Sequence, residues 1–585
     1  MPTTHRTRMH VARRLRTVGL WAVAWCCCGC ASAPFGSSSD WTATGCQGMV
    51  ASDHPLASEV GLAVLEDGGN AIDAAVATSL ALAVTRPYST GLGGGGFLLY
   101  WEARTQKVYV LDYREQAPVA ASPHMFERAQ RDRPDAPPAS KVGGLAVGGP
   151  GLLDGLDGAL QRFGSQTLED LAEPAYELAA QGFRVDEHHL DAARTVEARL
   201  RSYPSFESAG EPLRRRHLFD GVIPSEPPLL RQPELAEALQ LIGRDGVNAF
   251  YRGPIGQEVV LTARRYGGLL QMEDLRGYRP VWREPIKVTY RDTFDVYSMP
   301  PPSSGGICIA ETLNILEHWE LAELQKKDPA RAAHVTVAAL SQAFEDRAEH
   351  LGDADFVKVP VHRLTGKSYA AEIAERIRGG STHDDAMIAA PPNDGGTSHY
   401  CVVDQWGNVV AATETINTEF GSLLMTPRFG IVLNNEMDDF TAEPGKANAF
   451  GLIQSAQNAA ATRKRPLSSM SPTIVVRDGQ PILALGASGG PRIITSVLQV
   501  MLAVLEQDAP IGKAVAAPRL HHQWRPDVVY RNEFSADHAI IRGLAEQGYE
   551  ISDEQRMGVV QAIRIDDGTF TGASDPRKGG RPAGF

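Results

Sequence analysis

The spacing of hydrophobic and polar residues predicts helices near the start of the chain. Apolar residues recur at helical spacing over 55–66, and a second helical segment over 71–84 is apolar on nearly every face. This second segment contains Asp73 and is shorter than the roughly 20 residues that a membrane span needs. We therefore expect it to be a helix buried in the core of a folded domain.

A strand-like pattern follows a run of glycines. The segments 97–101 and 108–112 predict a β-hairpin, and the glycines lie directly before it, at 91–96. The letters of this run satisfy the dinucleotide-binding pattern GxGxxG, but that motif requires a strand before the glycines and a helix after them. We therefore reject a nucleotide site and expect the glycines to allow close packing of the backbone.

A second hairpin has a threonine at its start. Residues 397–404 and 409–415 predict two strands, and Gly395-Gly396 precedes the first of them after a loop rich in Gly, Pro, Asp and Thr. A threonine hydroxyl is a weak nucleophile, but cutting the chain before Thr397 would supply its own α-amine, with a pKa of about 7.7–8, as a base. The same residues also fit an ordinary turn that leads into a strand, and this segment alone leaves both interpretations open.

Further elements are expected downstream. We predict helices over 307–316 and 493–505, a hairpin over 473–477 and 482–485, and a strand over 429–433. Between these last two features, residues 441–464 form a polar segment with Pro, Gly and Asn that resembles a mobile flap.

The N-terminus predicts export. Several arginines precede a short apolar segment over 18–28, so we assign residues 1–29 to an export signal and 30–46 to a tether. The run Cys27 to Ser32 resembles a bacterial lipoprotein cleavage site, with Cys30 as the lipidated residue; simple cleavage and release is the alternative. We expect an exported, periplasmic protein that is either anchored in a membrane as a lipoprotein or released.

Composition excludes some other classes. A hydrophobic content of 43% is ordinary for a globular protein, and a formal net charge of −13 argues against a general nucleic-acid binder. Outside the export segment only Cys46, Cys308 and Cys401 remain, which is no disulfide framework. His521-His522 has one carboxylate nearby, Asp527, so we assign no metal site.

A set of motifs from about residue 47 to the end resembles the γ-glutamyltransferases, also called glutathione hydrolase proenzymes. The matching segments are 48–51, 55–58, 68–75, 111–118, 300–306, 346–356, 397–404, 434–440, 466–472 and 486–495. The resemblance implies an α+β fold, the N-terminal-nucleophile hydrolase αββα four-layer sandwich. It also implies self-cleavage between Gly396 and Thr397 into a large subunit, 47–396, and a small subunit, 397–585, which together form one intertwined catalytic domain.

The resemblance also implies roles for individual residues. Thr397 is the expected nucleophile, Thr415 its hydrogen-bond partner, and Gly489 and Gly490 supply an oxyanion hole. The residues expected to bind the α-carboxylate of a γ-glutamyl group are Arg114, Ser468 and Ser469, and those expected to bind its α-ammonium are Asn417, Glu436 and Asp439.

The implied substrates are glutathione and other γ-glutamyl compounds, with water, amino acids or dipeptides as acceptors and no cofactor. One departure lies in the expected flap, where Phe450 occupies a position at which bacterial relatives often have Tyr. Two alternatives stay open: an acylase for glutaryl-type or cephalosporin side chains, and a non-catalytic envelope lipoprotein that binds γ-glutamyl peptides.

Overall fold

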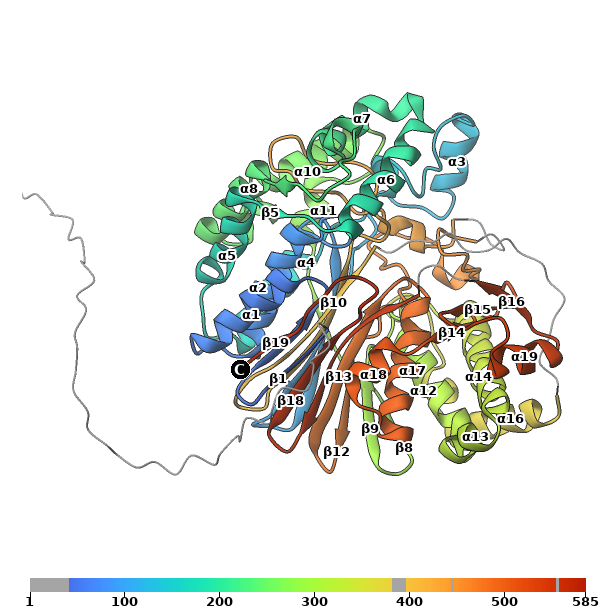
Figure 1. Cartoon of the computed structure of the whole chain (residues 1–585). Helices are drawn as coiled ribbons and strands as arrows, with labels where there is room; N and C mark the ends of the chain where they lie inside the picture. Colours follow the sequence, from blue (N-terminus) through green and yellow to red (C-terminus); the bar gives the residue numbers. More distant parts are fainter. Residues whose placement is uncertain (1–40, 381–395, 443–446, 554–556) are drawn as a thin grey trace, which may run out of the picture. The chain divides into compact units, whose positions relative to one another are not determined.

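The computed structural model describes residues 41–585 apart from 381–395, 443–446 and 554–556 (Figure 1). The expected export signal, the candidate lipidation site Cys30 and most of the loop before Gly396 therefore lie outside the described residues. In the part of the chain that is described, no helix combines the length and apolar character needed to cross a membrane.

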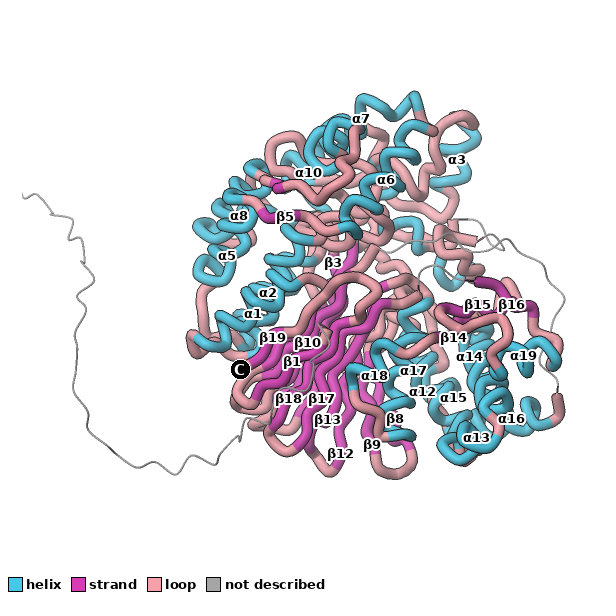
Figure 2. Tube along the Cα trace, in the orientation of Figure 1, coloured by secondary structure: helices cyan, strands magenta, loops and turns pink. Residues whose placement is uncertain are grey.

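Two seven-stranded sheets form the centre of the fold (Figure 2). The first contains, in spatial order, β1 (Thr42–Gly45), β18 (Thr569–Ser574), β17 (Val559–Asp566), β13 (Gln480–Ser488), β12 (Thr473–Arg477), β9 (Phe294–Ser298) and β8 (Ile286–Tyr290). The second contains β19 (Ala583–Gly584), β2 (Met49–Ser52), β10 (Ser398–Val403), β11 (Val409–Thr415), β3 (Gly95–Glu102), β4 (Lys107–Tyr113) and β7 (Val281–Arg283). Neighbouring strands are antiparallel throughout both sheets.

The alternation of side chains along β10 explains why the sheets lie between helices. Tyr400 and Val402 pack in the core that β10 shares with helices, whereas Cys401 and Val403 pack in the core that includes the first sheet. His399 also points toward the first sheet, because a Cβ placed on Gly486 of β13 would lie 2.2 Å from its ring. Cys401 is thus a buried cysteine of the core.

Helices cover the outer faces of the two sheets. The second sheet contacts α1 (Pro55–Glu66), α2 (Ala71–Thr85) and α4 (Leu152–Phe163). The first sheet contacts α12 (Gly305–Leu316), α17 (Arg492–Gln507) and α18 (Ile511–Ala516). The predicted αββα sandwich is therefore confirmed.

The remaining elements extend these layers. The other helices are α3 (Met125–Asp132), α5 (Leu168–Gln181), α6 (Glu187–Arg201), α7 (Glu207–His217), α8 (Pro233–Asp245), α9 (Asn248–Tyr251), α10 (Pro254–Arg265), α11 (Met272–Gly277), α13 (Leu321–Lys327), α14 (Pro329–His350), α15 (Val361–Leu364), α16 (Lys367–Arg378) and α19 (Ala539–Glu546). The small sheets comprise β5 (Phe183–Arg184) with β6 (Leu229–Leu230), and β14 (Arg519–His521), β15 (Val528–Asn532) and β16 (Glu550–Asp553).

Helix α2 is buried along its whole length, as its apolar composition predicted. Its one carboxylate, Asp73, accepts hydrogen bonds from the backbone of Asn70 and from the backbone and hydroxyl of Ser165. Asp404, just after β10, accepts a bond from the first helical N–H at Ala71 (2.9 Å). These contacts satisfy the helix N-terminus and fix α2 to the end of β10.

Two predictions about local structure need correction. Residues 429–433 do not form a strand; Val432 makes only an isolated bridge to Met425, and Gly430 bends the chain with a φ of 62°. The tether assigned to 30–46 ends earlier than predicted, because Thr42–Gly45 pair with β18. In both cases the pairing partner, which short-range pattern does not reveal, decides the outcome.

Candidate active site

The register of the second sheet places the predicted nucleophile and a predicted substrate-binding arginine at the same end of four adjacent strands. Ser398 pairs with Glu414, so Thr397 lies at the start of β10 beside Thr415 at the end of β11. Thr415 in turn pairs with Gly95 at the start of β3, and Arg114 follows the end of β4. Because neighbouring strands are antiparallel, the starts of β10 and β3 lie beside the ends of β11 and β4 at one edge of the sheet.

The glycine run before β3 makes this row possible. A Cβ at Gly94 would lie 2.1 Å from the carbonyl oxygen of Thr415, and one at Gly95 would lie 2.5 Å from that of Tyr113. No side chain fits at such distances, so glycine is required for the strands that carry Thr415 and Arg114 to approach β3. The expected role of these glycines in close packing is confirmed.

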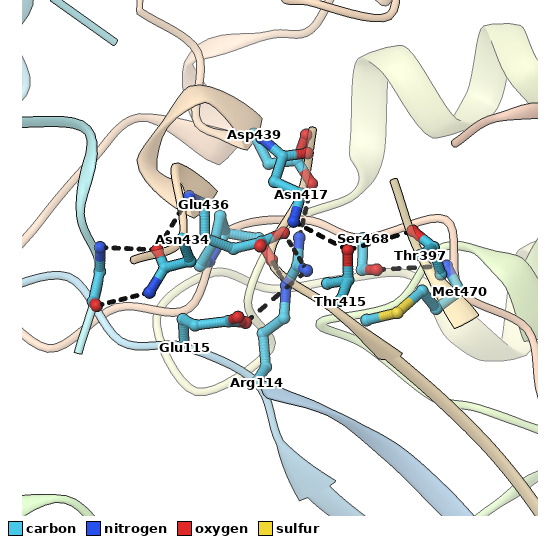
Figure 3. Close-up of polar contacts among 12 residues, drawn as sticks. Arg114, Glu115, Thr397, Thr415, Asn417, Asn434, Glu436, Asp439, Ser468 and Met470 are labelled. Atoms are coloured by element: carbon cyan, nitrogen blue, oxygen red, sulfur yellow. Dashed lines mark hydrogen bonds and ion pairs between the residues drawn. The ribbon is translucent and has the colours of Figure 1, made fainter. Parts of the chain in front are cut away.

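The hydroxyl of Thr397 lies 3.1 Å from that of Thr415 (Figure 3). The Thr415 oxygen accepts a hydrogen bond from the backbone N–H of Asn417 (2.8 Å), which leaves its own proton available to point at Thr397. Asn417 is itself fixed by donation from its side-chain amide to the carbonyl of Asn435 (2.9 Å).

The backbone at the predicted cleavage site is unusual. Thr397 has a φ of 154°, which a β-branched residue rarely adopts. A Cβ at Gly396 would lie 2.5 Å from the carbonyl oxygen of Asn417, so only glycine fits directly before Thr397. The backbone of Thr397, directly after the predicted scissile bond, is therefore held in a strained conformation by its surroundings.

Arg114 is the centre of a buried charged group, the Arg114 cluster, which consists of Arg114, Glu115, Glu436 and Asp439 (Figure 3). Its guanidinium donates to Glu436 and, over 2.6 Å, to Asp439, and one nitrogen lies 3.9 Å from Glu115. Burial lowers the pKa of Arg114, but the three carboxylates outweigh this effect and leave the pKa raised. Arg114 therefore stays charged.

The carboxylates of this cluster outnumber its cation. Burial raises the pKa of Glu115 to about 7, against the opposing effect of Arg114, and it also raises the pKa values of Glu436 and Asp439. Among the described residues, no N–H or O–H group donates to the side-chain oxygens of Glu115 or to the Oε2 atom of Glu436, although these two carboxyls interact with each other. Such a site favours a ligand that brings a positive charge and N–H donors.

Ser468 and Ser469 lie on a loop that the 300–306 turn holds in place. The carbonyl of Ser468 accepts bonds from the backbone and hydroxyl of Ser304 (2.8 and 2.7 Å), and the backbone N–H of Ser468 donates to Pro302 (2.8 Å). Arg347, from α14, donates to the same Ser304 hydroxyl over 3.0 Å. The Pro-Ser-Gly turn before α12 thus positions two predicted ligands of a carboxylate.

Gly489 and Gly490 connect β13 to α17. Their φ values of 121° and 58° both favour glycine. A Cβ at Gly490 would lie 2.6 Å from the ring of Phe450, which packs over this turn. This strand-to-helix turn has the sharp geometry in which successive N–H groups can face a developing negative charge.

All the predicted catalytic and substrate-binding residues except Gly489 line one small cavity of about 20 Å³. Gly489 lines an adjacent cavity of about 310 Å³, together with Lys578 and Arg492.

Motif matching did not single out three buried residues here: Glu115, Arg347 and Lys578. Glu115 and Arg347 lie within matched segments and could have been found there, whereas no sequence signal marks Lys578. In the described part of the chain, no cluster of three or more His, Cys, Asp or Glu side chains is arranged to hold a metal.

Comparison with known proteins agrees with this geometry. The family model described as gamma-glutamyltranspeptidase matches residues 57–585. The chain is 41% identical to the glutathione hydrolase proenzyme of Escherichia coli (strain K12) over 542 residues, covering 91% of this chain and 90% of the relative. It is 38% identical to the glutathione hydrolase proenzyme of Pseudomonas sp. (strain A14), covering 91% and 93%.

Among solved structures, the cephalosporin acylase from Bacillus halodurans superposes with a TM-score of 0.81 at 26% identity, covering 95% of this chain and 98% of that one. This likeness supports the shared fold, while the family model and the two proenzymes match nearly the whole folded chain at the level of sequence. The chain therefore belongs to the gamma-glutamyltranspeptidase family.

Proposed function

We propose that this protein is a self-processing γ-glutamyltransferase and glutathione hydrolase in which Thr397 is the nucleophile of both reactions. The observation that carries the proposal is the placement of the Thr397 hydroxyl, 3.1 Å from Thr415, in the same cavity as the Arg114 cluster. A nucleophile, its hydrogen-bond partner and a charged recognition site thus share one buried space.

The first reaction is cleavage of the chain itself. The Thr397 hydroxyl attacks the carbonyl of Gly396 and gives up its proton, the peptide C–N bond breaks, the departing nitrogen takes up the proton, and an ester between Gly396 and the threonine oxygen forms. Water then hydrolyses the ester and leaves Thr397 with a free α-amine. The strained φ of 154° supports this step, because breaking the bond before Thr397 removes the constraint on that angle.

The second reaction uses the freed amine as the base. The amine takes the hydroxyl proton, the threonine oxygen attacks the γ-carbonyl, and the leaving amine receives a proton. The backbone N–H groups of Gly489 and Gly490 stabilise the oxyanion. Water, or the amine of an amino acid or dipeptide, then takes the γ-glutamyl group from the ester, so ping-pong kinetics follow.

Charge selects the substrate. Arg114 with the hydroxyls of Ser468 and Ser469 suits an α-carboxylate, because guanidinium offers a planar pair of donors. Glu436 and Asp439, with Asn417, supply acceptors for an α-ammonium. A group that carries both charges on one carbon satisfies both sets, whereas a glutaryl group lacks the ammonium and leaves the surplus carboxylates unpaired.

Two p-nitroanilides, γ-glutamyl and glutaryl, test the proposal because they differ only at the α-ammonium. We expect hydrolysis of the γ-glutamyl compound with a kcat/KM at least about 100-fold above that of the glutaryl compound, since an unpaired buried charge costs several kcal/mol. Equal or preferred hydrolysis of the glutaryl anilide would favour an acylase, the activity of the structurally similar Bacillus halodurans enzyme. Tight binding of γ-glutamyl compounds without turnover would favour the binding-protein alternative.

Export and lipidation at Cys30 form a separate proposal, supported by the basic and apolar segments of residues 1–29. In a bacterial host that processes lipoproteins, the full-length chain should fractionate with membranes and incorporate labelled fatty acid. The variant Cys30→Ser should do neither, and an unlabelled wild-type chain in the soluble periplasmic fraction would overturn the anchor.

A further inference from the structure

A buried lysine binds the backbone of the proposed nucleophile. The Nζ atom of Lys578 donates to the carbonyl oxygen of Thr397 over 2.7 Å and to Asp53 over 2.8 Å. It also lies 3.4 Å from the hydroxyl of Ser488, the last residue before Gly489. One ammonium group thus touches the nucleophile residue, a carboxylate, and the strand that leads into the glycine turn.

Asp53 is held as firmly as the lysine. Its second oxygen accepts from the side-chain amide of Gln561 (2.7 Å). The guanidinium of Arg86 donates to the carbonyl oxygens of both Asp53 (2.7 Å) and Lys578 (2.9 Å), and it pairs with Asp186. The Lys578–Asp53 pair is therefore fixed at the side chains and at the backbone.

Burying the Lys578–Asp53 pair is energetically unfavourable, which indicates that the pair has a role besides stabilising the fold. Lys578 and Asp53 are 6% and 0% exposed, and burial lowers the pKa of Lys578 while Asp53 opposes that effect. Removing an ammonium and a carboxylate from water is unfavourable for each ion, and an apolar pair of similar volume often stabilises a fold as well or better. The contact that an apolar pair could not provide is the one to Thr397.

We propose that Lys578, held by Asp53, is a positioning residue that fixes the Thr397 backbone so that its hydroxyl and, after cleavage, its α-amine face the reacting carbonyl. This inference rests on the proposed function of Thr397 and deepens it. A free N-terminal residue has lost the peptide bond on its N-terminal side, so the carbonyl contact to Lys578 and the link to Ser398 in the paired strand β10 are what restrain its backbone.

The same contact has an electrostatic consequence in the processed enzyme. The amine nitrogen and the carbonyl oxygen of one residue are roughly 3 Å apart, which places the ammonium of Lys578 within about 6 Å of the freed amine. A positive charge at that distance disfavours the protonated amine, so Lys578 keeps the base in its active form to lower pH.

Other charges face this region and are the same in every variant, apart from the residue that is substituted. On the Lys578 side they are Arg86, Asp186, His188, Asp191, Glu419, Arg492, Glu533 and Arg577, and across the small cavity they are Arg114, Arg347, Glu436 and Asp439. Because these groups and Glu115 are present in all variants, a difference between the pH profiles of two variants reports the change at position 578 or 53.

The experiment compares wild type with Lys578→Met, Lys578→Arg and Asp53→Asn in the full-length protein. It measures the rate of self-cleavage, and then kcat, KM and the pH profile of kcat/KM for γ-glutamyl-p-nitroanilide. Lys326→Met, which alters an exposed lysine, is the matched control. Circular dichroism and thermal melting show whether each variant is folded.

We expect Lys578→Met to slow self-cleavage and to lower kcat at least about tenfold, with KM changed less than about threefold. The acid limb of its kcat/KM profile should move up by roughly one pH unit, because the variant removes a positive charge and leaves Asp53 negative. Asp53→Asn should leave this limb at or below its wild-type position, and Lys578→Arg should restore it. A Lys578→Met chain that is folded but uncut also supports positioning in the first reaction.

Three results would overturn the inference: an acid limb at the same pH in all variants, a loss confined to KM, or a loss that follows melting temperature alone. If wild type itself is neither cut nor active, the proposed function fails first. If wild type is cut and active while Lys578→Met retains its rates and its profile, only the role of Lys578 fails.

Discussion

Two buried ion-pair systems flank Thr397, and they differ in how completely their charges are matched. In the Lys578–Asp53 pair, one cation meets one anion, and each side chain has further polar partners. In the Arg114 cluster, one cation meets three carboxyl groups, and no N–H or O–H group among the described residues donates to three of their oxygen atoms.

This difference indicates that the Lys578–Asp53 pair supports the nucleophile, whereas the Arg114 cluster binds the substrate. A matched and fully hydrogen-bonded pair gains nothing from a further ligand and serves as a rigid support. In the Arg114 cluster burial disfavours the charged carboxylates, as their raised pKa values show, so a ligand cation that pairs with them recovers part of this burial cost. The contrast suggests that the incompletely paired charges belong to the substrate-binding Arg114 cluster, whereas the charges of the Lys578–Asp53 pair, which holds Thr397, are fully paired.

The largest effect should come from removing the cation of the cluster. Arg114→Ala leaves three buried carboxylates without their partner and removes the donors for the α-carboxylate, so kcat/KM should fall roughly 10²–10³-fold. Arg114→Lys keeps the positive charge but cannot bind a carboxylate through two parallel hydrogen bonds, so its kcat/KM should lie between those of wild type and Arg114→Ala. If Arg114→Ala stays within threefold of wild type, the cluster is not the recognition site.

The next effect concerns the ammonium. Asp439→Asn removes one acceptor charge, so KM for γ-glutamyl-p-nitroanilide should rise roughly 10–100-fold. Hydrolysis of the glutaryl anilide, which has no ammonium, should stay the same or improve. Equal losses for the two substrates would mean that Asp439 shapes the site without binding the ammonium.

A pH-dependent effect on stability should follow from Glu115. Its pKa is raised from 4.5 to about 7 in the folded state, so the folded protein binds more protons than the unfolded chain between these values. The free energy of unfolding should therefore fall as pH rises through this window, and Glu115→Gln should remove the loss. We expect the variant to gain on the order of 1–3 kcal/mol over the parent between pH 4.5 and 8.

Melting curves in the Thr397→Ala background measure this change on a single uncut chain, which keeps the unfolding simple to interpret. Glu226→Gln, at an exposed position, is the control and should run parallel to the parent at every pH. If stability changes with pH in the same way for Glu115→Gln as for the parent, the charged form of Glu115 does not destabilise the folded protein and the prediction is wrong.

The smallest effect should come from the hydroxyl beside the nucleophile. Thr415→Val keeps the shape but loses a hydrogen bond worth about 1 kcal/mol, so self-cleavage should slow roughly five- to tenfold. Thr415→Ser retains the hydroxyl and should stay within about twofold. The half-time of cleavage after purification of the uncut chain measures both, and equal rates for Val and Ser would remove Thr415 from the mechanism.

The spacing of apolar residues predicted an element correctly where the segment itself has a clear helical or strand periodicity. The helix predicted over 55–66 has those bounds, and the hairpin around β10 and β11 follows from alternation and its turn. The strand predicted over 429–433 was wrong because an apolar run is equally compatible with a bent, buried loop. Residues 42–45 looked like tether because their partner, β18, lies more than 500 residues later.

The site divides in the same way. Alternation and turn residues drew attention to Thr397, and family motifs supplied Arg114 and the other binding residues, all of which except Gly489 the structure brings into one cavity. Sequence alone could not reveal that Lys578 binds the carbonyl of Thr397, because the two are 181 residues apart and meet only once both sheets have formed.

The most direct test of the account is the intact mass of the purified protein under denaturing conditions, with Thr397→Ala beside wild type. Wild type should give two fragments, the smaller beginning at Thr397, and the variant should give one uncut chain. A wild-type chain that stays whole after prolonged incubation, or a variant that is cut at the same bond, would contradict the assignment of Thr397 as the nucleophile.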